Sequence, residues 1–85
     1  MSEYFHEWKA KTMVKLSNII NDVEDENLRK YIRHLIQRLA ELRSRDISSW
    51  IKDVMLIADY YPHIAKQLLS LIPSEELIHF WFEKI

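Results

Sequence analysis

The sequence predicts an all-α fold: a small single-domain bundle of four to five helices, in which two longer antiparallel helices are followed by shorter ones. Three observations lead to this prediction. The 85 residues include no glycine and only two prolines, so the chain lacks the residues on which strands, hairpins and sharp loops usually depend. Apolar residues recur at helical spacing along most of the chain. A chain of this length forms one domain with a small core, so residues 1–85 are expected to be a single helical domain.

The stretch from Leu28 to Arg43 has the strongest helical pattern. Its apolar residues recur at steps of four, three, four and three, which places them in one row on a helix. Tyr31 and Ile36 widen this row into an apolar arc of roughly 140°. We therefore expect a central helix that ends around Arg43 to Arg45 and packs its apolar row against the other helices. The row consists of Leu28, Ile32, Leu35, Leu39 and Leu42.

A first helix is expected from Ser2, as its N-cap, to about Ile20. The polar stretch 21–27 then supplies a turn, and either Asp22 or Asp25 is expected to cap the central helix. A loop this short makes the first two helices antiparallel neighbours. The inward face of the first helix is expected to hold Phe5, Trp8, Thr12, Met13, Leu16, Ile19 and Ile20.

A third helix follows, with Asp46, Ser48 or Ser49 as its N-cap. Leu56 and Tyr60 lie opposite its inward face and one helical turn apart, so they form a second apolar spot. This helix must therefore either lie between other elements or present that spot to a partner. The expected inward face consists of Ile47, Trp50, Ile51, Val54, Ile57, Ala58 and Tyr61.

Two prolines mark the remaining helices. Pro62 suits the first turn of a fourth helix, and after Pro73 the pattern restarts with Ser74 as the cap of a final helix through Phe82 or beyond. The apolar residues of the final helix spread over roughly 200°, more than a helix on the flank of a small bundle can bury. Some of them are expected to meet solvent or another molecule. The fourth helix is expected to turn inward Ala65, Leu68, Leu69 and Ile72.

The surplus of aromatic residues indicates a protein-binding surface, because such side chains desolvate a large area at low entropic cost. The alternative is that the two ends of the chain pack on each other, with Phe5 and Trp8 against Trp81 and Phe82. Both interpretations stay open. On the first, the partner-binding residues are Leu56, Tyr60, Ile78, Phe80, Trp81 and Phe82.

The net charge is only −1, but its distribution is uneven. Residues 28–45 carry six basic and one acidic side chain, whereas residues 1–27 and 46–85 each carry three basic and six acidic ones. Such a helix either contacts phosphates or acidic protein groups, or is a solvated helix paired with acidic neighbours. Residues 44–49 lack the tight glycine-bearing corner of a helix-turn-helix motif. The candidate contact residues are Arg29, Lys30, Arg33, Arg38 and Arg45.

No catalytic, cofactor or metal site is predicted. Glu3 with His6, and Glu76 with His79, repeat the Glu-x-x-His spacing of di-iron bundles, but such sites also need inward glutamates from two further helices. Glu24 and Glu26 fall in a turn, and Glu41 lies on the solvent arc. No Ser/His/Asp set with an identifiable context and no glycine-rich phosphate loop is present. We therefore expect a non-enzymatic protein.

The sequence also predicts a location. It has no cysteine and no apolar run that approaches membrane-spanning length, and residues 1–9 lack the basic start and apolar core of a signal peptide. We therefore expect a cytoplasmic protein without membrane association. Its scarcity of thermolabile and flexible residues resembles that of thermophile proteins.

The chain resembles the small all-helical accessory subunit found with the B-family replicative DNA polymerase of crenarchaeal archaea. The resemblance lies in the overall size, the helical composition without glycine or cysteine, the Arg-rich second helix and the aromatic tail HFWFEKI at 79–85. It implies a non-catalytic subunit that docks on a DNA polymerase during DNA replication and helps it stay on DNA. No binding residue is transferred by this resemblance.

The leading expectation is therefore a protein–protein interaction subunit, with nucleic acid reached through the partner or the basic helix and with a homodimer also open. The alternative is a stand-alone nucleic-acid-binding protein that uses the basic face of the helix beginning at Leu28.

Overall fold

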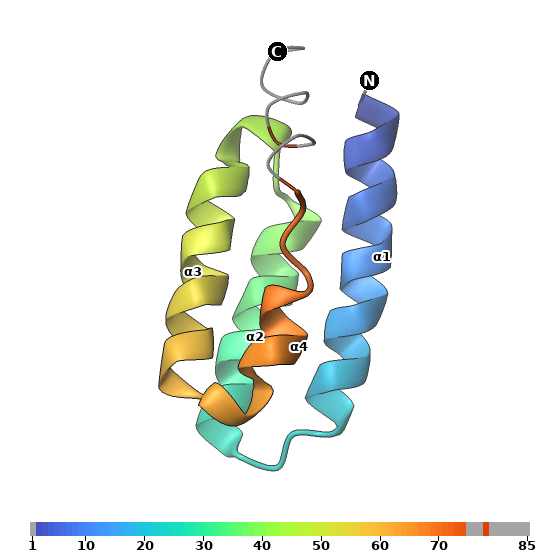
Figure 1. The fold of residues 1–85 in the computed structure, drawn as a ribbon. Coiled ribbons are helices and arrows are strands. Elements are labelled where there is room, and N and C mark those ends of the chain that lie inside the picture. Colours follow the sequence, from blue (N-terminus) through green and yellow to red (C-terminus); the bar gives the residue numbers. More distant parts are fainter. Residues whose placement is uncertain (1, 75–77, 79–85) are drawn as a thin grey trace.

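The computed structural model describes residues 2–74 and Ile78, and within them it confirms the all-α bundle. The first two helices are α1 (Ser2–Asn21) and α2 (Glu26–Ala40). They are followed by α3 (Ile47–Tyr60) and the short α4 (Ala65–Leu69), each preceded by a 3-10 turn. Helix α1 packs on α2, α2 on α3 and α3 on α4 (Figure 1). None of the helices in this part of the chain combines the length and the apolar character needed to cross a bilayer.

The turn between α1 and α2 is closed by an N-cap. The Oδ1 atom of Asp25 accepts hydrogen bonds from the backbone N–H groups of Asn27 (2.9 Å) and Leu28 (3.1 Å). These groups have no partner inside the helix, so the carboxylate satisfies two of the free donors of α2. Of the two aspartates predicted as alternatives, Asp25 is therefore the cap.

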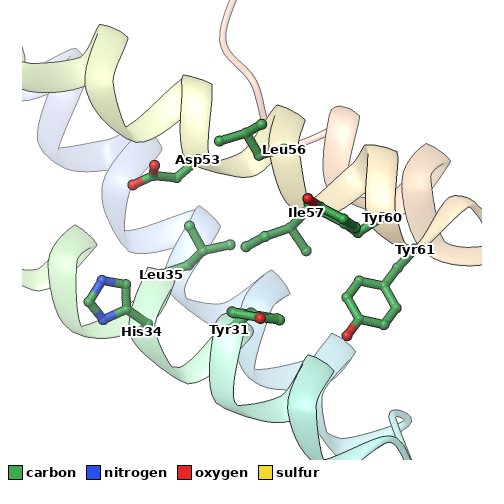
Figure 2. Close-up of a pocket in the computed structure, with 8 residues that line it drawn as sticks. All are labelled: Tyr31, His34, Leu35, Asp53, Leu56, Ile57, Tyr60 and Tyr61. Carbon is green, nitrogen blue, oxygen red and sulfur yellow. The ribbon is translucent and has the colours of Figure 1, made fainter.

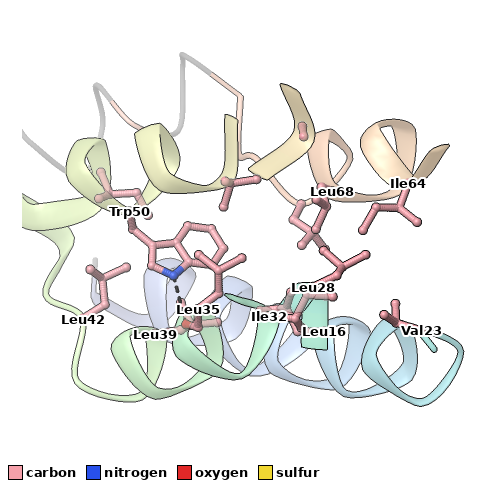
Figure 3. Packing of buried hydrophobic residues seen from close by; sticks show 14 of the residues in the cluster. Leu16, Val23, Leu28, Ile32, Leu35, Leu39, Leu42, Trp50, Ile64 and Leu68 are labelled. Atoms are coloured by element: carbon pink, nitrogen blue, oxygen red, sulfur yellow. Dashed lines mark hydrogen bonds between the residues drawn. The ribbon is translucent and has the colours of Figure 1, made fainter. Parts of the chain in front are cut away.

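The core is built around the apolar row of α2, whose members are buried as predicted. The fully buried Trp50 of α3 packs on this row, and its indole N–H donates to the carbonyl oxygen of Leu35 (Figure 3). Trp8 of α1 meets Trp50 edge to face, with ring centroids 5.5 Å apart, and donates to the carbonyl oxygen of Leu71. The two tryptophans thereby join α1, α2, α3 and the segment after α4.

All of the predicted inward residues of the first and third helices are buried or half-buried. Phe5, Thr12 and Leu16 are buried on α1, and the Thr12 hydroxyl donates back to the Trp8 carbonyl. The remaining predicted residues of α1 and α3 lie at the edges of the core or within it. They are Trp8, Met13, Ile19, Ile20, Ile47, Trp50, Ile51, Val54, Ile57, Ala58 and Tyr61.

Helix α2 is shorter than predicted. It ends at Ala40, and the backbone N–H of Glu41 bonds back to the carbonyls of Arg38 and Leu39 in a tightened last turn. Leu42 lies beyond the helix yet is buried, and its carbonyl oxygen accepts a hydrogen bond from Lys9 Nζ at 2.9 Å. The side chain therefore continues the apolar row although the backbone has left the helix.

The predicted fourth helix is also different. A 3-10 turn at Pro62–Ile64 precedes only five α-helical residues. Leu69, predicted to face inward, is 46% exposed, whereas Ile64 and Leu71 are buried. Leu68 is fully buried as predicted, and Ala65 and Ile72 pack against the core. The prediction of an inward side chain is therefore wrong for Leu69 alone.

Candidate interaction groove

A surface cavity of about 280 Å³ lies between α2 and α3, hereafter the α2–α3 groove. Its floor is formed by Leu35 of α2, which is fully buried, and Ile57 of α3, and the two side chains point toward one another (Figure 2). Both belong to the helical rows that hold α2 and α3 together, so the groove is set directly on the core. Its lining residues are Tyr31, His34, Leu35, Asp53, Leu56, Ile57, Tyr60 and Tyr61.

One end of the groove is aromatic. The rings of Tyr31 and Tyr61 are 6.2 Å apart between centroids and tilted by 54°, a geometry within the favourable range for aromatic pairs. Tyr61 also meets the ring of His63 edge to face. Tyr31 was predicted to widen the inward arc of its helix, but it is 50% exposed and forms a wall of the groove instead.

The hydroxyl of Tyr61 is held in its neutral form. Its partial burial, and after it the nearby charge of Asp25 and the Tyr31 hydroxyl, raise the pKa of Tyr61 above its usual value. A neutral phenol can donate a hydrogen bond as well as accept one. The aromatic end therefore offers a donor to a bound molecule at any physiological pH.

The opposite end of the groove is polar. Arg38 of α2 forms an ion pair with Asp53 of α3 and also donates to the hydroxyl of Ser49 at 3.2 Å. About a third of each charged side chain is exposed, so solvent screens the pair and its contribution to stability is modest. Its geometric effect is to connect the two helices beside the groove. Asp53 and His34 lie at this end, away from Tyr61 (Figure 2).

The second apolar spot predicted on the third helix lies on the outer wall of the groove. Leu56 is 57% exposed and Tyr60 80% exposed, so both point away from the core as predicted. Of the other residues of the predicted partner-binding set, only Ile78 lies within the described residues. Ile78 is half-buried and packs against the core, and its backbone N–H donates to the Ser74 carbonyl at 3.1 Å in a helical bond. The remaining members, Phe80, Trp81 and Phe82, lie outside the described residues.

The predicted basic surface does not act as one unit. Arg29 donates to the carbonyl oxygens of Ile20 (2.8 Å) and Val23 (3.0 Å), so it closes the end of α1 instead of facing solvent. Arg38 is used in the ion pair beside the groove. These two arginines therefore have structural partners, and the pair of Arg38 with Asp53 fits the alternative of a helix paired with acidic neighbours. The exposed members of the set are Lys30, Arg33 and Arg45.

The lining residues are mainly apolar and aromatic. The groove offers an apolar floor, aromatic walls and phenol hydroxyls, and its one carboxylate is already paired with an arginine. Within residues 2–74 and Ile78, no three histidine or acidic side chains come together as a metal site. The sequence indicated Leu56 and Tyr60 as exposed but did not indicate Tyr31 and Tyr61 as wall residues. For Tyr31, its position at the edge of the apolar arc was the available signal.

Searches of protein-family models, of curated proteins and of solved structures found no match to this chain.

Proposed function

We propose that the chain is a non-enzymatic interaction subunit that binds a protein partner at the α2–α3 groove. The observation that carries this proposal is the exposure of Leu56 and Tyr60 beside Tyr31, around an open cavity. These side chains contribute little to the core of the free protein. Covering one of them with a partner is worth roughly 1.5–3 kcal/mol, so a small groove of this kind suffices for specific binding when its rings fit a partner segment.

A first candidate partner comes from the resemblance to polymerase accessory subunits. On this proposal the partner is a B-family replicative DNA polymerase, and the chain is a structural subunit in DNA replication. The support consists of the helical fold and the exposed groove. Contact between the chain and nucleic acid would then occur through the assembled complex.

The test is sedimentation velocity of the purified chain mixed with the B-family polymerase of its host. The double variant Leu56→Ser with Tyr60→Ser should no longer co-sediment with the polymerase and should keep the thermal transition of the wild type. Val14→Ser with Leu69→Ser is the matched control, because both residues are exposed and lie on α1 and α4. If the groove variant still co-sediments like the wild type, the groove is not the binding surface.

Stand-alone nucleic-acid binding has less support. Only three of the five predicted basic contacts remain exposed, and they are distributed over α2 and the turn before α3. If each neutralised one phosphate of duplex DNA, the logarithm of affinity would fall with the logarithm of salt at a slope of about −3. A salt titration with duplex and single-stranded DNA measures this slope directly, and no binding near physiological salt would remove the alternative.

A further inference from the structure

The α2–α3 groove is too small to hold two copies of the chain together by itself. Tyr31, Leu56 and Tyr60 are between half and four fifths exposed. With about 150–250 Å² for a large aromatic side chain, they supply roughly 350 Å² per molecule, less than half of the ~800 Å² per partner in a standard interface. A short segment of another protein matches this area better than a second copy does.

The chemistry of the walls favours a segment whose backbone is exposed. Tyr31, Tyr60 and Tyr61 each carry a hydroxyl, and among residues 2–74 and Ile78 none of these hydroxyls has a hydrogen-bond partner. A helical ligand uses most of its own backbone carbonyls internally. A polyproline II segment has no internal hydrogen bonds, so its carbonyls accept from phenol donors while its proline rings pack on the aromatic faces.

Acidic residues lie near the aromatic end, although exposed Lys30 is adjacent to Tyr31. The turn that leads into α2 carries four exposed acidic residues, and one of them, Asp25, is close enough to act on the Tyr61 hydroxyl. At the other end the carboxylate of Asp53 is neutralised by Arg38. A ligand with a basic residue next to its prolines would therefore place that residue at the Tyr61 end. The acidic residues of the turn are Asp22, Glu24, Asp25 and Glu26.

We propose that the α2–α3 groove binds a proline-rich segment of the partner in the polyproline II conformation, with a lysine or arginine beside the acidic turn before α2. This inference rests on the proposed function, because it names the kind of partner segment that the groove accepts. The prolines would pack on the exposed faces of the contacting rings of Tyr31 and Tyr61 and on the exposed ring of Tyr60.

The test uses the whole chain, labelled with ¹⁵N, and three short peptides. The first is hexaproline followed by two arginines, the second is hexaproline followed by two glutamates, and the third is a helix-forming leucine–alanine peptide followed by two arginines. The first peptide should shift the amide signals of α2 and α3 around the groove. It should bind more tightly than the second peptide, and this difference should shrink as salt is added.

Matched variants locate the site. Tyr60→Ala and Tyr31→Ala should each weaken binding of the first peptide by up to about tenfold, the value of one favourable ring contact. Tyr4→Ala replaces a tyrosine of similar exposure on α1 and should leave the affinity unchanged.

The following results would contradict the proposal of a proline-rich ligand. If the leucine–alanine peptide binds the groove more tightly than hexaproline with arginines, the ligand is a helix, and the proposed function still stands. If no peptide shifts the groove signals, or if the free chain is a dimer that Leu56→Ser with Tyr60→Ser separates, the proline-rich ligand is wrong. The proposed function is decided independently, by whether that double variant loses the polymerase.

Discussion

The indole N–H of Trp50 donates a 3.1 Å hydrogen bond to the backbone carbonyl oxygen of Leu35 at the buried centre of the bundle. The carbonyl belongs to the interior of α2, where it also accepts from the helix ladder, and a carbonyl oxygen has two lone pairs for two donors. The bond therefore joins α3 to α2 without breaking the helix. It satisfies the one polar atom of the largest fully buried side chain.

The first prediction concerns this bond. Trp50→Phe keeps an aromatic ring but removes the donor, so it should lower the free energy of unfolding by about 1–2 kcal/mol. Trp50→Ala also leaves a large cavity and should cost about 3–5 kcal/mol. Urea denaturation followed by circular dichroism measures both values. Equal losses for the two variants would show that packing alone, and not the hydrogen bond, explains the role of Trp50.

The second prediction compares two leucines that line the same groove. Leu35→Ala removes a fully buried side chain and should cost about 2–5 kcal/mol. Leu56→Ala removes a side chain that is more than half exposed and should change stability by less than about 0.5 kcal/mol. Thermal and urea denaturation of both variants provide the measurement. A large loss for Leu56→Ala would place Leu56 in the core and would remove it from the interaction surface.

The third prediction separates two arginines of α2. Arg29→Gln loses the hydrogen bonds to the carbonyls of Ile20 and Val23 and should cost about 1–2 kcal/mol. Arg33→Gln changes an exposed side chain and should stay within about 0.5 kcal/mol of the wild type. The comparison requires only urea denaturation of two variants with the same change of charge. If both variants melt alike, Arg29 does not close the end of α1.

The fourth prediction concerns pH. Because the folded environment raises the pKa of Tyr61 above its usual value, its contribution to stability should be complete below that usual value, near 10. It should be lost as the pH rises through the higher pKa of the folded state. An ultraviolet titration of phenol ionisation should lose a late component in Tyr61→Phe. The stability of this variant should also fall less steeply on the alkaline side, and an unchanged titration curve would contradict the assignment.

Much of the fold follows from spacing alone. The side chains of Leu28, Ile32, Leu35 and Leu39 are buried because they form one apolar stripe on their helix, and such a stripe is removed from water when it packs in the core. Spacing could not show that α2 ends before Leu42, since that residue continues the row from a non-helical backbone.

The fourth helix shows a second limit. Of its predicted inward residues, Leu68 is buried and Ala65 and Ile72 pack against the core, whereas Leu69 is 46% exposed. The core also contains Ile64 and Leu71, which were not predicted to face inward. Only Ala65–Leu69 are α-helical, so the spacing of a longer helix could not place these two residues.

The sequence predicted only some of the residues that form the walls of the groove. Leu56 and Tyr60 stand out because they lie opposite the buried face of their own helix. Tyr61 lies just beyond the last residue of α3, and Tyr31 lies at the edge of its apolar arc, where a side chain becomes core or wall according to which helix packs beside it. That neighbour is a property of the tertiary structure, which a single helical wheel does not contain.

The ion pair of Arg38 with Asp53 and the ring contact of Tyr31 with Tyr61 fasten the two helices at opposite ends of the groove. The width of the groove is therefore fixed in the free protein. Association costs about 0.5–1.5 kcal/mol of entropy for each flexible side chain that is immobilised, and most of the side chains immobilised here belong to the partner segment. Arg38→Gln would release one end, so calorimetry of partner binding should show a weaker affinity with a larger unfavourable entropy, even though no contact with the partner has been removed.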